Sequence, residues 1–439
     1  MIRITPSRAM SLGISLLLAA QPVAGQELTL VQALDAALAS HPALGAAAAR
    51  VEGADAALQG ARAQRLPSLA GSAGLTRFQE PMLVAPLHAF DPTNIPDFER
   101  SLVRAELAAQ YTVYEGGARG ARIRGADAMA DAARWSMEAT EAQLLERVTE
   151  AYLGVLSARE IRAATERHVQ ALESERDRAE RHLAEGTAPR VEVLRAEAAL
   201  LDARAQATSA QARVGLAERS LARVMGTDVD SLEGRALQEV GMGAAVAPGA
   251  TAHPLVERSR RAADGAQARL DQERASLLPR ISASAGLLDY GNLGSDHVAE
   301  WQAGLRVSWP IFTGGARSAS IRRAEAEVRA AEGDLRNTEL QIGTATDAAE
   351  AALTESTARA DALAAAVVQW EEVARIEGLS VREGVGTQAD LLRAEAGLFQ
   401  ARAGFARARH ESALARVRLA RALGNLNMTW MATALEMAR

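Results

Sequence analysis

The side chains that most often carry out chemistry in proteins are scarce in this chain. Its 439 residues include seven histidines and no cysteine, and all 49 basic residues are arginine because lysine does not occur. A P-loop, a Schiff base and a kinase site each need a lysine, and thiolate-bound metals need cysteine. His168 and His182 share one predicted helix but lie about 21 Å apart, too far to share a metal. We therefore expect no catalytic residue, no cofactor and no metal site.

The N-terminal residues are typical of a secretory signal peptide covering 1–25. Two arginines precede an apolar run over 9–20, and the small residues Val23 and Gly25 fit cleavage before Gln26. The alternative is an anchor helix, but the run is too short to span a bilayer, and no later segment offers the roughly 18 to 20 apolar residues required. A formal net charge of -6 and the absence of a basic block argue against nucleic-acid binding.

The chain contains two copies of one unit. Residues 65–75 (RLPSLAGSAGL) correspond to 277–287 (LLPRISASAGL), and the GGAR at 116–119 corresponds to the GGAR at 314–317. A unit near 200 residues is too long for a solenoid repeat and indicates a duplicated domain. We divide the chain into a first repeat over 26–226, a linker over 227–252, a second repeat over 253–424 and a tail over 425–439.

Each repeat is expected to consist mainly of very long helices. No proline lies between Pro96 and Pro189 and none follows Pro310, and these intervals are rich in Ala, Leu, Glu and Arg. Small residues along the predicted seams favour a broad helical array, although any long coiled coil would show such seams. The predicted helices cover 43–64, 121–184, 189–225, 255–276, 316–382 and 388–423, with hairpin tips at about 185–190 and 383–388. His41 and His253 precede prolines at predicted helix starts.

Four segments alternate apolar and polar residues with a period of two, at about 68–76, 102–112, 281–288 and 301–310. A tilted transmembrane strand needs about 9 to 11 such residues. Trp301 and Trp309 stand at the two ends of one apolar face, and Tyr111 ends another, where an interfacial aromatic girdle would lie. A soluble sheet with one face on a core gives the same alternation.

The number of strands bears on assembly. Four strands cannot close a barrel, and an open edge in lipid leaves backbone groups unsatisfied. Two chains would give eight strands, too narrow for a large duct, whereas three would give twelve. The expected fold is mainly α with a small β part: coiled-coil hairpins form a periplasmic α-barrel, and four strands per chain complete a 12-stranded β-barrel in a homotrimer.

At this level the sequence resembles the TolC-like outer membrane efflux proteins over essentially the whole mature chain. The motifs that carry the resemblance are LTLVQALDAALASHP from Leu28, WPIFTGGAR from Trp309, EGTAPRVEVLRAEA from Glu185 and EGVGTQADLLRAEA from Glu383. The resemblance implies a passive trimeric outer-membrane duct of a Gram-negative tripartite efflux or type I secretion system. Such a duct extends far into the periplasm, and an inner-membrane pump supplies the energy.

The resemblance also implies where partners bind. Residues of the two hairpin tips would meet a periplasmic adaptor protein: Gly186, Thr187, Gly384, Gly386 and Thr387. Glycine permits the reversal between helices, and Thr187 or Thr387 can cap the returning helix. The alternative is that these residues only form the turns.

Four charged residues near the tips would face the periplasmic entrance. Asp390 lies where some members of the family have an acidic residue, and Glu192 is its counterpart in the first repeat. Six carboxylates per trimer would favour cations. One turn further on, arginines replace a second acid, at Arg393 and Arg195. They could neutralise the ring or pair with it across subunits, or all four could be solvated surface charges.

Two other classes of function remain open from the sequence. A periplasmic coiled-coil tether or scaffold would use the strands as a small soluble sheet. An adaptor protein is less consistent with the sequence, because adaptors usually carry one hairpin and this chain has two. The sequence does not distinguish drugs, metal ions and polypeptides as cargo.

Overall fold

The computed structural model describes residues 27–83, 93, 98–228, 232, 235–241, 252–294 and 297–436. The predicted signal peptide and most of the predicted linker lie outside these residues. The elements, in chain order, are α1 (Leu30–Ser40), α2 (Pro42–Ala63), β1 (Ser68–Leu83), β2 (Phe98–Tyr114), α3 (Ala118–Ala184), α4 (Arg190–Met225), α5 (Pro254–Ala275), β3 (Arg280–Gly291), β4 (His297–Ser308), α6 (Ala316–Arg382), α7 (Gln388–Ala422) and α8 (Met428–Glu436).

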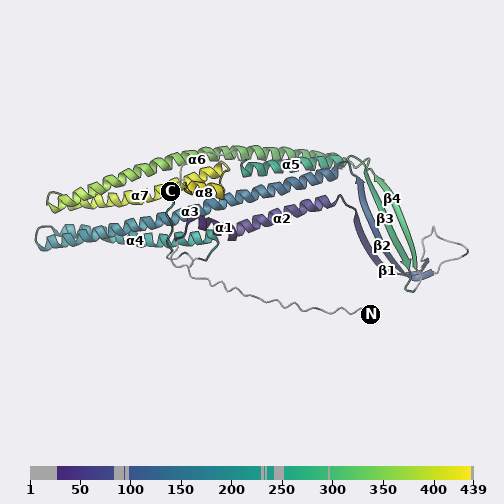
Figure 1. Ribbon diagram of the computed structural model, residues 1–439, viewed down its shortest axis with the longest axis horizontal. Coiled ribbons are helices and arrows are strands. Elements are labelled where there is room, and N and C mark those ends of the chain that lie inside the picture. Colours follow the sequence, from purple (N-terminus) through teal and green to yellow (C-terminus); the bar gives the residue numbers. More distant parts are fainter. Residues whose placement is uncertain are drawn as a thin grey trace.

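The molecule is a long rod with the sheet at one end and both hairpin tips at the other (Figure 1). Helices α3 and α6 have 67 residues each, about 100 Å at 1.5 Å per residue. The shorter helices α2 and α4 both pack along α3, and α5 and α7 both pack along α6. Two short helices therefore run end to end beside each long one.

The N-terminal helical region differs from the expectation of one helix from residue 43. A separate helix, α1, precedes α2 and begins at a capping box in which Thr29 and Gln32 bond each other's backbone N–H. His41 is extended, with φ −71° and ψ 125°, and its side chain accepts a hydrogen bond from the Ala43 N–H. Because the residue before a proline avoids helical geometry, Pro42 ends α1 and starts α2. His253 starts α5 in the same way.

The four strands form one antiparallel sheet in the order β1-β2-β3-β4. β1 and β2 have 16 and 17 residues and extend well beyond the predicted 68–76 and 102–112. Pro81 lies where the β1–β2 register shifts, a position that tolerates proline. β4 ends at Ser308, so Trp309 lies just outside the strand that was predicted to contain it. Pro310 has no N–H with which to continue the ladder.

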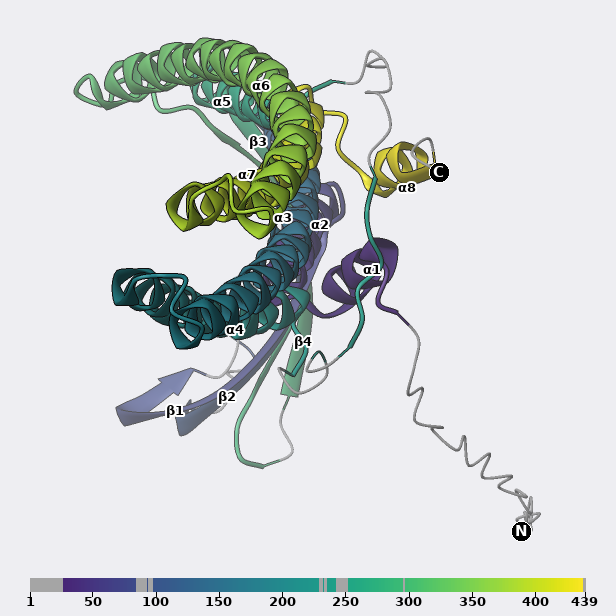
Figure 2. The ribbon, with the colours of Figure 1, turned by 90° about the vertical axis from the view of Figure 1, so that its left-hand side faces the viewer.

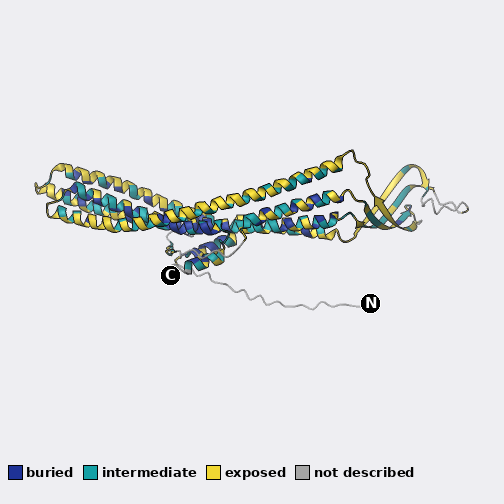
Figure 3. Ribbon diagram, turned by 90° about the horizontal axis from the view of Figure 1, so that it is seen from above, coloured by how far each residue is buried: buried dark blue, intermediate teal, exposed yellow. Residues whose placement is uncertain are grey.

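Strand register places the four predicted apolar faces on one side of the sheet. Ala109 of β2 is opposite Leu69 of β1 and Ala285 of β3, and Ala285 is opposite Ala303 of β4. Further along, Leu287 is opposite Trp301. Since residues two apart share a face, the alternating apolar residues of all four strands form one continuous surface. This surface is open to solvent in the single chain, as the exposed strands of Figure 3 show.

The main buried core lies in the middle of the rod, beside α1 and α8 (Figure 3). Tyr152 of α3 is fully buried there, and its hydroxyl lies 2.6 Å from the Leu28 carbonyl oxygen and 2.8 Å from that of Gln238. Leu28 and Leu237 form a parallel β-bridge. Two segments that are far apart in sequence are thus joined to the middle of α3.

Seen along its axis, the rod is a curved wall with α1 and α8 on its convex side (Figure 2). α3 packs against α4 and α7, and α7 packs against α6, so α4 and α6 form the two edges of the hairpin half of the wall. The edge helix α6 buries only Ala324, Ser356 and Ala374, whereas the equally long α3 buries twenty residues. Because α6 packs against other helices only on one side, its other side is left uncovered in the single chain.

Candidate functional site

The predicted girdle aromatics lie at two levels of the sheet. Trp301 projects from the open apolar face with 74% of its surface exposed. Eight residues of extended chain, about 26 Å, separate it from Trp309, whose indole N–H donates to the Leu277 carbonyl oxygen at 3.0 Å. Tyr111 is half-buried, with the Arg119 guanidinium carbon 5.3 Å from its ring centroid. Trp309 and Tyr111 therefore mark the helical end of the sheet, and Trp301 lies toward its far end.

Each strand-to-helix turn is held by an arginine that sequence reasoning treated only as a repeat marker. Arg119 donates from Nη2 to the Thr112 carbonyl oxygen, and Arg317 donates from Nη2 to the Pro310 carbonyl oxygen. The two carbonyls are equivalent, because both repeats are offset by 198 residues here. In each repeat the second residue of the long helix thus bonds back to the end of the strand. The occurrence of GGAR in both repeats was the signal for this role.

The first hairpin tip is a tight turn between α3 and α4. Gly186 adopts φ 73° and donates to the Leu183 carbonyl oxygen at 3.0 Å. Thr187 does not cap α4, contrary to one of the two predicted alternatives. Its N–H and its hydroxyl both donate to the His182 carbonyl oxygen, at 2.9 and 3.0 Å. The N-cap of α4 is Pro189, which has no side-chain acceptor.

The second tip does use its threonine as a cap. Thr387 Oγ1 accepts the Asp390 N–H at 3.2 Å, and the hydroxyl donates to the Asp390 carboxylate at 2.5 Å. At the 198-residue offset, Thr387 corresponds to Pro189, and Thr187 corresponds to Val385. Gly386 approaches the preceding helix so closely that an added Cβ would lie 2.7 Å from the Ser380 Cβ. Val385 is 83% exposed at the apex.

Of the four predicted entrance charges, Glu192 and Asp390 lie in the first turns of α4 and α7, and Arg195 and Arg393 lie one turn further on. Asp390 pairs with Arg393 of the same chain, with Nη1 and Oδ1 2.5 Å apart. Glu192 begins α4 and is partly buried, while Arg195 is exposed. Among the described residues no ion-pair partner is recorded for either. An arginine therefore offsets the charge of Asp390 within one subunit, whereas Glu192 keeps its charge unpaired.

A second cluster, absent from the predicted sites, joins the two hairpins across the α3–α7 contact. Glu160 of α3 accepts hydrogen bonds from Arg409 and from His410, whose Nε2 lies 3.0 Å from Glu160 Oε1. His410 is only 5% exposed. Closer to the tips, the rings of His168 and Phe399 stack with centroids 5.0 Å apart. Sequence spacing could not reveal either pair, because the partners lie more than 200 residues apart and in different repeats.

The described residues contain neither a cluster of metal ligands nor a helix that could span a membrane. In the part of the chain that the structure describes, no three His, Asp or Glu side chains are grouped as metal ligands. No described helix is both long enough and apolar enough to cross a bilayer.

Comparison with known proteins decides the family. The profile described as "Outer membrane efflux protein" matches residues 33–227 and 252–425. The chain belongs to the outer membrane efflux protein family. Each matched segment contains one of the two hairpins. Membership places the chain among outer-membrane transport channels rather than among enzyme families.

Two curated relatives support this membership in the efflux family. Protein CyaE of Bordetella pertussis is 30% identical over 388 residues, which cover 84% of this chain and 78% of CyaE. The outer membrane efflux protein BepC of Brucella suis is 28% identical over 317 residues, covering 69% of this chain and 68% of BepC.

Solved outer-membrane proteins share the fold of this efflux protein. The outer membrane protein VceC from Vibrio cholerae has a TM-score of 0.78 at 20% identity, over 90% of this chain and 96% of VceC. The Campylobacter jejuni outer membrane channel CmeC has a TM-score of 0.80 at 17% identity, over 93% and 89%. The fold is therefore that of known outer-membrane channels.

The cluster of Glu160, Arg409 and His410 predicts that the α3–α7 contact stabilises this efflux protein to an extent that depends on pH. Burial alone would raise the pKa of Glu160, but hydrogen bonds and charge from His410, together with Arg409, lower it below the ordinary 4.5. Arg409 also lies 3.8 Å from Glu239. Because the folded state favours the ionised carboxylate, the stabilisation is complete above pH 4.5 and is lost as the pH falls through the lowered value.

Glu160→Gln should therefore lower the melting temperature of the detergent-solubilised protein at neutral pH. The difference from wild type should shrink at acid pH, below the lowered pKa of Glu160, where both side chains are uncharged. Glu166→Gln is the matched control on the same helix, because Glu166 is 56% exposed and its pair with Arg162 is weak. An equal difference at both pH values would contradict the assigned role of Glu160.

Proposed function

We propose that the chain is one subunit of a homotrimeric export duct of the outer membrane. The observation that carries the proposal is the four-stranded sheet, whose apolar residues form one exposed surface and whose outer strands β1 and β4 each have a free edge. In lipid each unpaired backbone group costs several kcal/mol, so the edges must be closed by other chains. Three chains give a twelve-stranded barrel wide enough for a lumen.

The helical wall supports the same assembly. The two lateral edges of the wall, α4 and α6, both carry exposed apolar side chains, including Leu201, Leu216, Leu340 and Val368. Joining α6 of one subunit to α4 of the next would cover these residues. Three curved walls would then close into a tube continuous with the barrel.

The hairpin tips are proposed as the docking site for a periplasmic adaptor protein. Both tips lie at the end of the rod opposite the sheet (Figure 1) and expose backbone and an apolar side chain, Val385. Photo-crosslinking from positions 185 and 385 in cells should trap one adaptor at both tips. Crosslinking from position 201, where Leu201 of the edge helix α4 is 66% exposed, should instead trap a second copy of this chain. Tips that trap only envelope lipids or nothing would contradict adaptor docking.

The entrance charges predict a change of ion selectivity. Asp390→Asn with Glu192→Gln removes six carboxylates per trimer and frees Arg393 from its intrachain pair. We expect cation preference in single-channel recordings to fall, and block by multivalent cations to weaken. Arg393→Gln should act in the opposite direction, because it leaves Asp390 uncompensated. If neither variant changes selectivity, these residues are surface charges away from the entrance.

The alternative of a periplasmic scaffold receives no support from the comparisons, which find channel proteins. Fractionation separates the two functions. A duct should remain in outer membranes washed with high salt and should conduct ions when reconstituted in planar bilayers. A scaffold should be released with the periplasm and should not conduct.

A further inference from the structure

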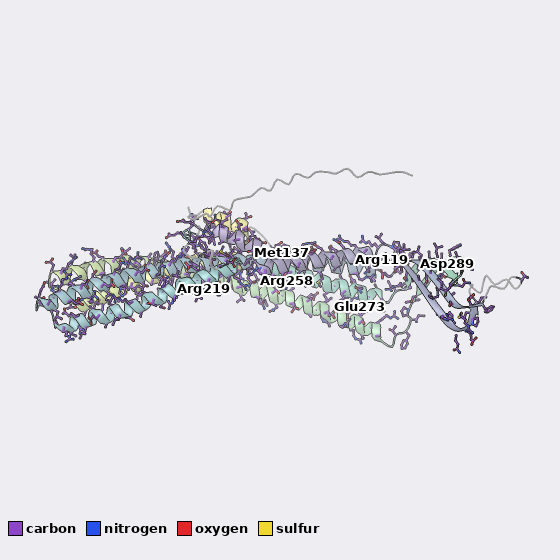
Figure 4. All side chains as sticks on the ribbon, turned by 90° about the horizontal axis from the view of Figure 1, so that it is seen from below. Arg119, Met137, Arg219, Arg258, Glu273 and Asp289 are labelled. Atoms are coloured by element: carbon purple, nitrogen blue, oxygen red, sulfur yellow. The ribbon has the colours of Figure 1, made fainter. Side chains whose placement is uncertain are left out.

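A groove of about 1050 Å³ lies near the middle of the rod, lined by residues of α3, α5, α6 and α7. On α7, Glu411 and Ala415 line the groove, whereas Ala413 and Val417, each two residues further along and so on the opposite side of the helix, pack in the core beside α1 and α8. Figure 2 shows α1 and α8 on the convex side of the wall, so the residues that line the groove face the other, concave side. Figure 4 places Arg258, one of its residues, at the middle of the long axis.

The groove carries more arginine than its acidic residues can neutralise. Glu146 pairs with Arg418 at 3.4 Å and with Arg421 at 2.6 Å, and Arg418 also pairs with Glu150, beside the lining, at 3.1 Å. Arg359 pairs with Glu355 at 2.7 Å. The remaining charged residues of the lining are Arg258, Arg407 and Glu411. Neither Arg258 nor Arg407 has a carboxylate partner among the described residues. With Glu150 counted beside the three lining glutamates, five arginines face four carboxylates and leave an excess of one positive charge per chain.

The first repeat shows that the helical packing does not require these arginines. At the offsets that relate the repeats, 212 for α5 and 198 for α6 and α7, four of the five positions are uncharged in the first repeat. The counterparts, in the order Arg258, Arg359, Arg407, Arg418 and Arg421, are Ala46, Ile161, Ser209, Ser220 and Arg223. The same kind of helix pair thus forms without them, and their concentration in the second repeat calls for a different explanation.

We propose that the groove is a binding site for polyanionic solutes, that is, solutes with several carboxylate or phosphate groups, on their way through the duct. The inference rests on the proposed function, because the concave face borders a lumen only in the closed assembly. The edge helix α6 supplies one wall of the groove, and the other walls belong to α3, α5 and α7 of the same chain, so a neighbour that packs on the outer side of α6 leaves the groove open. Guanidinium groups bind carboxylate and phosphate in bidentate geometry. A concave, water-filled wall also focuses the positive electrostatic potential of these arginines on a solute in the lumen.

The test is block of single channels by a defined polyanion. Wild-type protein is reconstituted in planar bilayers at low salt, and hexacyanoferrate(II), with four negative charges, is added on the side of the β-barrel. Low salt matters because the screening length is only about 10 Å at 0.1 M. We expect concentration-dependent block, with the half-blocking concentration about tenfold higher in Arg258→Gln/Arg407→Gln.

Two further variants separate charge from geometry. Glu411→Gln removes an acid from the same groove and should lower the half-blocking concentration about two- to threefold. Arg258→Lys/Arg407→Lys keeps both charges and should retain most of the block, with the remaining loss reflecting the bidentate geometry. All three proteins should keep the wild-type conductance in the absence of the blocker, which shows that they are folded.

The possible results separate a failure of the proposed anion site from a failure of the proposed duct. A conducting wild type whose block is absent, or is unchanged by Arg258→Gln/Arg407→Gln and Glu411→Gln, overturns the anion site and leaves the duct intact. A correctly reconstituted wild type that never conducts overturns the duct, and the anion site with it.

Discussion

Replacing Leu305 with arginine is expected to prevent assembly of the protein in the outer membrane. Leu305 is 74% exposed on the apolar face of β4, midway between Trp301 and Trp309 in the sequence. If these tryptophans mark the two interfaces, residue 305 lies near the centre of the bilayer. An arginine there costs about 2–4 kcal/mol per strand, or about 6–12 kcal/mol for three subunits. The readout is the amount of trimer recovered from purified outer membranes.

The opposite face of the same strand provides the matched control. Gln302 lies opposite Gly286, and Arg306 on the same face lies opposite Ser282. Gln302→Arg therefore adds a guanidinium to a face that already carries one and that should line the wet lumen. Its trimer yield should remain close to that of the wild type. Equal recovery of Leu305→Arg and Gln302→Arg would show that neither face contacts lipid.

Gly116→Ala should destabilise the protein far more than the equivalent substitution Gly314→Ala. Gly116 has φ 63°, and an added Cβ would lie 2.8 Å from the Ala275 carbonyl oxygen and 2.8 Å from the Leu278 Cβ. The backbone conformation costs about 1–2 kcal/mol with a side chain, and the overlap adds about 1–3 kcal/mol. The position is sensitive because the turn between β2 and α3 packs directly on the end of α5.

Gly314 offers the same backbone conformation without the contact. It has φ 61°, and no atom lies within 4 Å of the position of an added Cβ. Gly314→Ala should therefore show only the backbone cost. Thermal melting of the two detergent-solubilised variants measures the difference. Equal losses would mean that the first strand-to-helix turn is not packed as described.

The sequence predicted the parts of the fold that depend on local pattern. Long intervals without proline indicated α3 and α6, and α6 has the predicted bounds. Alternation in the strands predicted which residues share a face, and the register in the sheet then aligned those faces. The extra length of β1 and β2 could not be predicted, because pairing continues there through a bulge and a proline that lower the local strand signal.

Features that depend on contacts distant in sequence were missed. The Glu160–His410 bond joins two repeats, and nothing in the spacing of either helix reveals it. The different roles of Thr187 and Thr387 follow from a two-residue shift of threonine within the tips, and both positions fit a cap when only composition is considered.

An export duct of this kind requires strands that face lipid and whose free edges are closed by sister subunits. Light scattering on mature protein extracted from outer membranes measures this most directly, with the detergent contribution subtracted. We expect three chains per particle, extraction only with detergent, and precipitation when the detergent is removed. A monomer that stays soluble in water without detergent would contradict the central claim.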